Sequence, residues 1–116
     1  MKVLCCGDRH WNNFQIVRDY LKKLPKDVTI IYRDSKGADS CVDRAVGELG
    51  LKAKKLPANW DDFGFTLDPL LDIEGKDLKP DLVLAFHNNL KNSRGTAGIV
   101  NEAKRRGIKV EVISAW

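Results

Sequence analysis

The first residues whose types suit ligand chemistry form the segment Gly7-Asp8-Arg9-His10-Trp11, directly after a short apolar run. A glycine lets the backbone turn sharply and approach a ligand, an arginine pairs with phosphate, and an indole stacks on a nucleobase. We therefore predict ligand contacts from Gly7, Asp8, Arg9 and Trp11. The alternative is structural: Trp11 would cover the end of a sheet while Asp8 and Arg9 pair with each other.

A second group of small and polar residues, Ser35-Lys36-Gly37-Ala38-Asp39-Ser40, precedes a predicted helix. The N-terminus of a helix presents unpaired N–H groups and a partial positive charge, which suit an anion. A lysine adds a point charge, so we place Lys36, Gly37, Ala38 and Asp39 in the predicted ligand site. The spacing matches neither the dinucleotide-binding nor the P-loop motif. An ordinary helix start, with Asp39 as its first acid, is the alternative.

The loop at residues 88–96 has the most specific pattern, because it follows the most apolar predicted strand and opens a helix. Serine and threonine hydroxyls cap helices or donate to phosphate oxygens, and an arginine adds a bidentate fork. We predict ligand contacts from Ser93, Arg94, Gly95 and Thr96. The alternative is an ordinary capped turn.

Further candidates come from an aromatic loop and a lone histidine. Trp60, near Phe63 and Phe65, could wall one side of the pocket, although core or lid packing suits these aromatic residues as well. His87 follows a predicted strand, where an acid or base would stand, although a polar plug is the commoner role of such a histidine. If the chain is an enzyme, its general base is expected among Asp8, Asp39 and His87. No Ser-His-Asp or Cys-His set stands out in the sequence.

The spacing of apolar residues predicts the elements that must position these loops. Five strands are expected at residues 2–6, 28–32, 51–56, 81–86 and 108–113, and three helices at 13–24, 38–49 and 96–106. We predict a loop at residues 57–68 and one or two helical turns at residues 69–76. The strand at 51–56 is polar, so we expect it near an edge of the sheet. This alternation predicts an α/β fold: a single Rossmann-like domain over residues 1–116, with a mainly parallel five-stranded sheet and helices on both faces. The carboxyl ends of its strands, and the four loops above, would then meet at one edge.

Composition sets limits on the class of protein. The chain has 116 residues, 43% of them apolar and 31% charged, which fits one globular domain. The net charge of +4 permits an anionic ligand but does not by itself indicate nucleic acid. The sequence has no apolar run of the roughly 18 residues that a membrane span needs, and the first apolar stretch is too short for a signal peptide. We expect a cytoplasmic protein.

The cysteines indicate neither a disulfide framework nor a zinc site, because Cys5, Cys6 and Cys41 are odd in number and lack a CxxC spacing. Cys5 and Cys6 fall within the first predicted strand, where a core role is expected. We predict no metal and no cofactor.

Five blocks, in order, resemble the small YspA/YpsA-type proteins of the SLOG superfamily, which are relatives of the DprA and Lonely-guy proteins. The blocks are residues 2–11, Lys36-Gly37-Ala38-Asp39-Ser40, Pro57-Ala58-Asn59-Trp60, residues 80–86 and Ser93-Arg94-Gly95-Thr96-Ala97. The resemblance implies a Rossmann-like domain that binds nucleotides or nucleotide-derived ligands, a homodimer, and a bacterial or phage source. It also implies that the Gly-Ala-Asp and Arg-Gly-Thr blocks face phosphate and ribose.

The chain also departs from the pattern of that family. Arg33 stands where the family has a glycine, so it would fill or recharge the pocket, and we include it in the predicted ligand set. The segment Asp68-Pro69-Leu70-Leu71-Asp72 lacks the family's Arg and Asn. The first acid after Thr96 is Glu102, so the glutamate that the phosphoribohydrolase branch carries shortly after its Gly-Thr is missing. These departures favour binding over hydrolysis.

We therefore expect a protein that senses or sequesters a nucleotide-derived ligand. Three alternatives stay open: a nucleotide or nucleoside-monophosphate hydrolase, a single-stranded-DNA-binding module, and a degenerate scaffold that binds a protein partner. The DNA-binding hypothesis is the least favoured, because the sequence shows no evident stripe of basic residues.

Overall fold

The computed structural model describes residues 1–34, 36–56, 70, 77–89 and 95–114. In this part of the chain the order of elements is β1 (Lys2–Gly7), α1 (Phe14–Lys22), β2 (Thr29–Arg33), α2 (Ala38–Leu49), β3 (Lys52–Leu56), β4 (Leu82–Phe86), α3 (Gly95–Arg105) and β5 (Lys109–Ile113). The strands form one sheet in the order β3-β2-β1-β4-β5, and every neighbouring pair is parallel. The predicted α/β fold with a five-stranded parallel sheet is confirmed.

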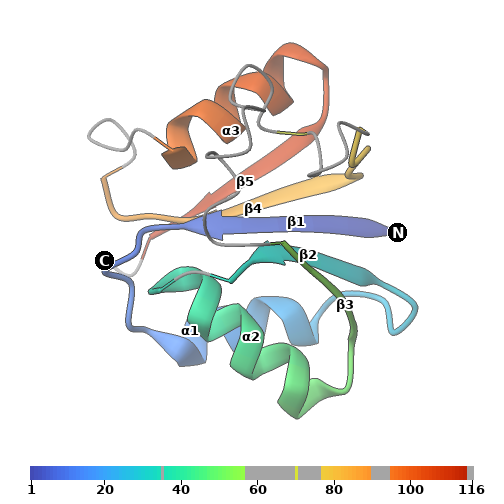
Figure 1. Cartoon of the computed structure of the whole chain (residues 1–116), viewed down its shortest axis with the longest axis vertical. Helices are drawn as coiled ribbons and strands as arrows, with labels where there is room; N and C mark the ends of the chain where they lie inside the picture. Colours follow the sequence, from blue (N-terminus) through green and yellow to red (C-terminus); the bar gives the residue numbers. More distant parts are fainter. Residues whose placement is uncertain (35, 57–69, 71–76, 90–94, 115–116) are drawn as a thin grey trace.

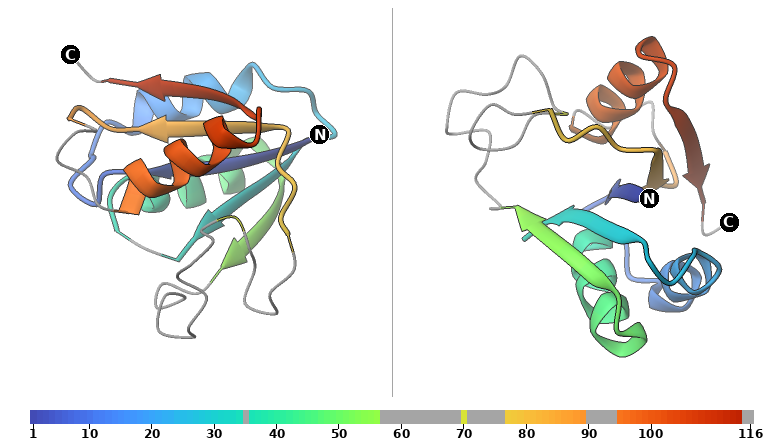
Figure 2. Two further views of the ribbon diagram at one scale, coloured as in Figure 1. Left: turned by 90° about the horizontal axis from the view of Figure 1, so that it is seen from above. Right: turned by 90° about the vertical axis from the view of Figure 1, so that its right-hand side faces the viewer.

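The helices lie on both faces of the sheet, as Figure 1 shows: α1 and α2 cover one face and α3 covers the other. Side chains that alternate along each strand fill both interfaces. In β1, Val3 and Cys5 join the apolar cluster under α1 and α2, whereas Leu4 and Cys6 join the cluster under α3. The views of Figure 2 show the same three layers from above and from the side. This double burial explains why the central strands are continuously apolar.

The predicted strands agree closely with the observed ones. Every residue of β4 is buried, as expected of the most apolar strand. The polar strand β3 lies at an edge of the sheet, as predicted, and four of its five residues are exposed. Lysines on such a strand discourage pairing with another sheet.

Some boundaries and segments differ from the prediction. Helix α1 ends at Lys22 rather than at residue 24, because the N–H groups of Lys23 and Leu24 bond three residues back, to the carbonyls of Tyr20 and Leu21, and so tighten the last turn. The predicted loop at residues 57–68 lies outside the described residues. The predicted turns at 69–76 lie outside them as well, except for Leu70, which is buried against the α3 face of the sheet.

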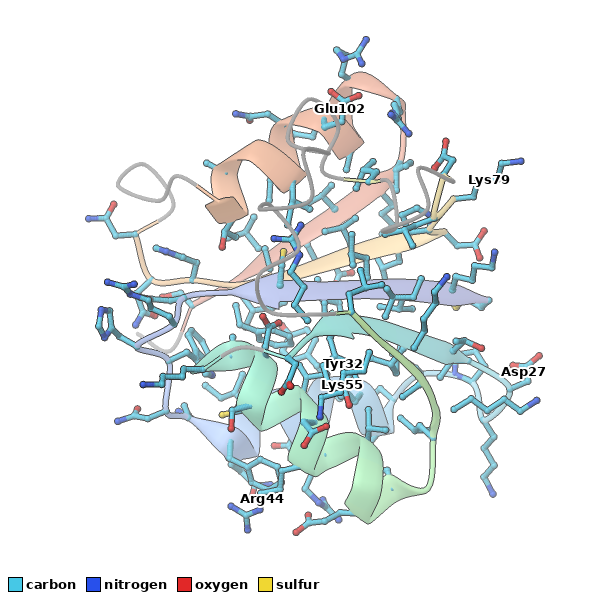
Figure 3. All side chains as sticks on the ribbon, in the orientation of Figure 1. Asp27, Tyr32, Arg44, Lys55, Lys79 and Glu102 are labelled. Carbon is cyan, nitrogen blue, oxygen red and sulfur yellow. The ribbon has the colours of Figure 1, made fainter. Side chains whose placement is uncertain are left out.

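A polar network joins β2, α2 and the edge strand β3. The Tyr32 hydroxyl donates to Asp43 Oδ1, and Lys55 Nζ lies 3.4 Å from the same oxygen. Figure 3 shows Tyr32 and Lys55 together beside α2. The Tyr32 hydroxyl holds the pKa of Asp43 below its usual range, with Lys55 acting in the same direction. The network therefore favours the ionised form of the Asp43 carboxyl.

Among the described residues, no helix has both the length and the apolar character that crossing a membrane requires.

Candidate ligand site at the carboxyl edge of the sheet

The strand order creates a topological switch point between β1 and β4. From β1 the chain winds to β2 and β3 on one side, and it then returns to build β4 and β5 on the other side. In open parallel sheets, ligands bind beyond the carboxyl ends of the strands at such a point. Gly7 pairs with Phe86 at these ends, and the next residues of the two strands are Asp8 and His87. The two predicted residues therefore stand at the switch point.

Asp8 and His87 face each other across this point. Asp8 Oδ2 lies 4.0 Å from His87 Nε2, while Asp8 Oδ1 accepts a hydrogen bond from the His10 N–H. His87 Nδ1 accepts from the Asn89 N–H at 3.0 Å. Because Nδ1 is the acceptor, the neutral ring carries its proton on Nε2, toward Asp8. Within the described part of the chain, the Asp8 carboxylate contacts His10 and His87 rather than Arg9, so the Asp8–Arg9 pairing considered above does not form there.

The start of α2 packs tightly on the loop that follows β1. The Ala38 N–H donates to the Asp8 carbonyl at 2.9 Å. Gly37 has a φ of +74°, and a Cβ there would lie 2.3 Å from the same carbonyl oxygen; a Cβ at Gly7 would lie 2.4 Å from the Phe86 carbonyl oxygen. Both glycines are therefore required by close approach of one chain segment to another. Their contact with a ligand stays a prediction.

Asp39, the second residue of α2, is the most perturbed carboxyl at this edge. Burial raises its pKa from 3.8 to about 7, and the positive charge of Arg33 partly opposes this change. Within the described part of the chain, its buried Oδ1 has no hydrogen-bond partner. Buried oxygens of this kind are uncommon because leaving one unpaired costs about 1–3 kcal/mol. Asp39 is therefore a strong candidate to accept a hydrogen bond from a ligand.

The buried thiol of Cys6 lies on the same side of the sheet as Arg33, by strand alternation. Burial, with a smaller contribution from the negative charge of Asp39, raises the pKa of Cys6 to about 12, and Arg33 opposes it. A thiol in this environment is protonated at neutral pH and inert. The core role that the sequence suggests for Cys6 therefore agrees with its burial, and the chemistry of this edge belongs to the carboxyl, imidazole and guanidinium groups.

The remaining predicted residues differ in their burial, and three of them lie outside the described residues. Trp11 is 4% exposed, packs against Phe86 with 5.7 Å between ring centres, and donates from Nε1 to the Asn13 carbonyl. This is the arrangement that the structural alternative for Trp11 expects. Thr96 is buried at the start of α3, whereas Arg9 and Lys36 are exposed. Gly95 is the first residue of α3. Trp60, Ser93 and Arg94 lie outside the described residues.

A pocket that the sequence analysis did not predict lies beside α2. It is lined by Trp11, Asn12, Phe14, Gly37, Ser40, Cys41 and Arg44. The signal that could have found it is helical spacing, because Ser40 and Cys41 lie four and three residues before Arg44, that is, about one turn of α2 before it. The sequence does not show that Phe14, at the start of a different helix, faces them.

Among the described residues, no three His, Cys, Asp or Glu side chains are grouped to hold a metal ion. Comparison with protein-family models gives no match, and comparison with curated proteins gives none either.

Proposed function

We propose that the chain binds a nucleotide or nucleotide-derived ligand at the carboxyl edge of its sheet, and that it senses or sequesters this ligand. The observation that supports this most is the buried Oδ1 of Asp39, which has no hydrogen-bond donor among the residues that the structure describes. Ligand hydroxyl or amino groups are such donors. Asp39 also lies beside the switch point between β1 and β4, which is where parallel sheets bind ligands.

Charges around Asp39 support an anionic ligand. Arg33 is near enough to influence the pKa of Asp39, and the exposed Arg9 and Lys36 belong to the loops next to it. Helices α2 and α3 both begin at this edge, so their N-termini add partial positive charge. A ligand with phosphate and hydroxyl groups would place its negative charge among these cations and donate a hydrogen bond to Asp39.

The test is a thermal-shift and calorimetry panel of the purified protein with NAD, ADP-ribose, cyclic ADP-ribose, AMP, cyclic dinucleotides and nucleoside monophosphates. A ligand at 100 times its Kd stabilises the native state by about 2.7 kcal/mol, which raises Tm by several degrees. Asp39→Asn keeps an acceptor oxygen but loses the negative charge that strengthens a hydrogen bond from the ligand, so it should weaken binding about tenfold or more. The matched control is Asp43→Asn, one turn further along α2 and engaged with Tyr32 instead.

Two results would reject the proposal: a panel with no shift, or a ligand that Asp39→Asn binds as tightly as the wild type. Recovery of the bound ligand unchanged would support sensing or sequestration.

A hydrolase is a second candidate, supported by the facing Asp8 and His87 and by the pKa of Asp39 near 7. A general base works best with a pKa near the working pH. Turnover of a bound ligand, abolished by Asp39→Asn or His87→Gln, would favour this function. Absence of product with a tightly bound ligand would reject it.

From the resemblance to SLOG proteins we further propose a homodimer and a bacterial or phage source, and from the composition of the sequence we propose a cytoplasmic location. Light scattering coupled to size-exclusion chromatography tests the dimer: a monomer at all concentrations would reject it.

A further inference from the structure

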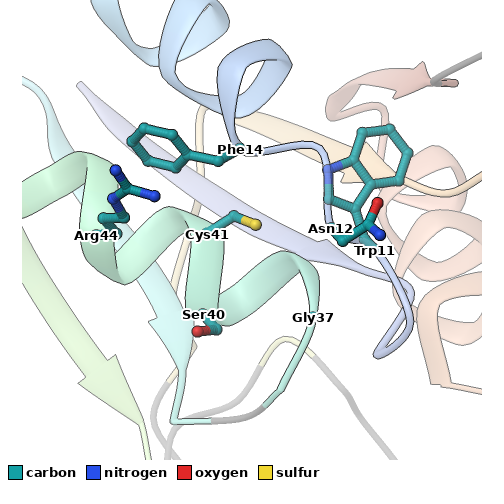
Figure 4. A pocket seen from close by; sticks show the side chains of 7 residues that line it. All are labelled: Trp11, Asn12, Phe14, Gly37, Ser40, Cys41 and Arg44. Carbon is teal, nitrogen blue, oxygen red and sulfur yellow. The ribbon is translucent and has the colours of Figure 1, made fainter.

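The pocket beside α2, which we call the Trp11–Arg44 pocket, differs in chemistry from the carboxyl-edge site. Figure 4 shows its two walls. Trp11, Asn12 and Phe14, where the chain enters α1, form the first. The start of α2 forms the second, with Gly37, Ser40, Cys41 and Arg44. Its volume of about 320 Å³ lies at the lower end of small-molecule pockets and suits a ligand of one ring system.

Backbone contacts hold the two walls in place. The Asp8 carbonyl accepts from both the Trp11 N–H, at 3.0 Å, and the Ala38 N–H, at 2.9 Å, so one oxygen ties the first wall to the start of α2. On the first wall, the Asn13 carbonyl accepts from the Trp11 indole, and the Asn13 side chain caps α1 through the Ile16 N–H. A pocket fixed in this way needs little ordering on binding, which favours affinity for a small ligand.

The side chains of the pocket combine a flat aromatic–cation pair with neutral polar groups. Arg44 Cζ lies 4.0 Å from the centre of the Phe14 ring, so the guanidinium covers that ring. Guanidinium groups pair with carboxylates and pack against aromatic rings. The seven lining residues include one cation, Arg44, and no acid. The Arg44 side chain is 64% exposed and has Glu48 at 3.6 Å, a weak surface pair that a ligand anion can displace.

We propose that the Trp11–Arg44 pocket binds a small planar aromatic carboxylate. The aromatic ring of the ligand packs against the side chains of Phe14 and Cys41, and its carboxylate pairs with Arg44. The Ser40 hydroxyl and the Asn12 amide are the neutral donors at the rim of the pocket. The pocket shares Trp11 and Gly37 with the predicted nucleotide site, but the inference does not rest on the proposed nucleotide function, since such a compound has neither ribose nor phosphate.

Cys41 provides a reporter inside the pocket. It is partly exposed, whereas Cys5 and Cys6, the other two cysteines of the chain, are buried. Burial raises the pKa of the Cys41 thiol, and Arg44 partly opposes this. Alkylation by iodoacetamide is therefore slow at neutral pH and is best followed at about pH 9, where more thiolate is present. A ligand that occupies the pocket should slow this reaction at Cys41.

The experiment measures, by mass spectrometry of the native full-length protein, the alkylation rate of Cys41 with and without about 10 mM of three probes. Benzoate is both aromatic and anionic, benzamide is aromatic and neutral, and cyclohexanecarboxylate is anionic and not aromatic. We expect benzoate to slow alkylation about threefold, as occupancy with a Kd of about 5 mM requires. The other two probes should have less than half of that effect.

Two arginine variants test the assignment of the carboxylate. Arg44→Gln should abolish protection by benzoate, whereas Arg18→Gln should keep it. Arg18 is the matched control because it also pairs with Glu48, at 3.5 Å, but does not line the pocket. Protection is expressed as the ratio of rates with and without probe in each variant, because loss of Arg44 also changes the thiolate fraction of Cys41. Phe14→Leu, which keeps an apolar side chain, should weaken protection as well.

Three outcomes would overturn the proposal: no slowing by benzoate in the wild type, equal slowing in Arg44→Gln, or equal slowing by cyclohexanecarboxylate. Asp39→Asn should keep protection by benzoate. The assay therefore separates failure of this pocket from failure of the nucleotide site.

Discussion

The stability of the protein should increase at neutral pH when Asp39 is replaced by asparagine. The Asp39 carboxyl has a pKa of about 7 in the folded protein instead of 3.8, because burial penalises its charged form. In the unfolded chain the carboxyl releases its proton near pH 4, whereas the folded state retains it up to about pH 7. The wild type therefore loses stability as the pH rises between these two values. Asp39→Asn removes the titrating group and this loss with it.

The difference in pKa sets the size of the effect. About three pH units at about 1.36 kcal/mol per unit give a limit of about 4 kcal/mol above pH 7. The substitution also removes the favourable interaction of an ionised acid with a helix N-terminus, and this lowers the gain in stability by about 0.3–1 kcal/mol. Burial therefore dominates, and we expect a net gain in the free energy of unfolding of about 3–4 kcal/mol at about pH 8. Near pH 4 the variant and the wild type should differ little.

Urea denaturation followed by circular dichroism, at several pH values between about 4 and 8, measures this effect. With an m value of about 1.5 kcal/mol per M, the midpoint of Asp39→Asn should exceed that of the wild type by more than about 1 M at the alkaline end. Asp43→Asn is the control, and it should lower the stability at neutral pH, since the Tyr32 hydroxyl holds the pKa of Asp43 below its usual range. A stability difference between Asp39→Asn and wild type that is the same at both ends of the pH range would refute the reasoning.

Three further predictions follow from local contacts. Gly37→Ala should destabilise the fold by more than about 2 kcal/mol, since its Cβ would meet the Asp8 carbonyl and its φ is +74°. Gly47→Ala in α2 has open space around it and should stabilise the fold by about 0.5–1 kcal/mol. Urea denaturation midpoints test both variants. Tyr32→Phe should cost about 1 kcal/mol at neutral pH, and chemical denaturation should show this cost fading as the pH falls through the lowered pKa of Asp43. Without probe, iodoacetamide should modify Cys41 alone in the native protein and all three cysteines in urea, as peptide mapping would show; modification of another cysteine in the native state would contradict the burial described here.

The sheet was predictable because its information is local. Strand β4 is apolar at every position, which directly reflects burial on both faces. The lysines of β3 indicate an edge strand, because burying their charges would cost a large free energy. The alternation of strands and helices then fixes parallel pairing and the edge at which ligand loops meet.

The site was predictable only in part, because its geometry depends on contacts between distant residues. The sequence singled out Asp8 and His87 separately, but their facing positions follow from the pairing of β1 with β4. Trp11 illustrates the opposite case: an indole in a polar loop suggests base stacking, yet packing against Phe86 and a bond to a nearby carbonyl bury it. The pairing of Arg44 with Phe14 required the position of two helices relative to each other.

Asp39 and Asp43 show most clearly what environment adds to residue type. They are the same residue one turn apart on α2, yet burial raises the pKa of the first, while a hydrogen bond from Tyr32 lowers that of the second. Asp43 has its partners within the fold, and these partners stabilise its charge. Asp39 reduces stability at neutral pH and leaves a buried oxygen unpaired among the described residues. Since an asparagine there would avoid the buried charge, the presence of a carboxyl agrees with the proposal that Asp39 contacts a ligand. The same substitution therefore tests both claims: Asp39→Asn should unfold at a higher urea concentration and bind its ligand more weakly than the wild type.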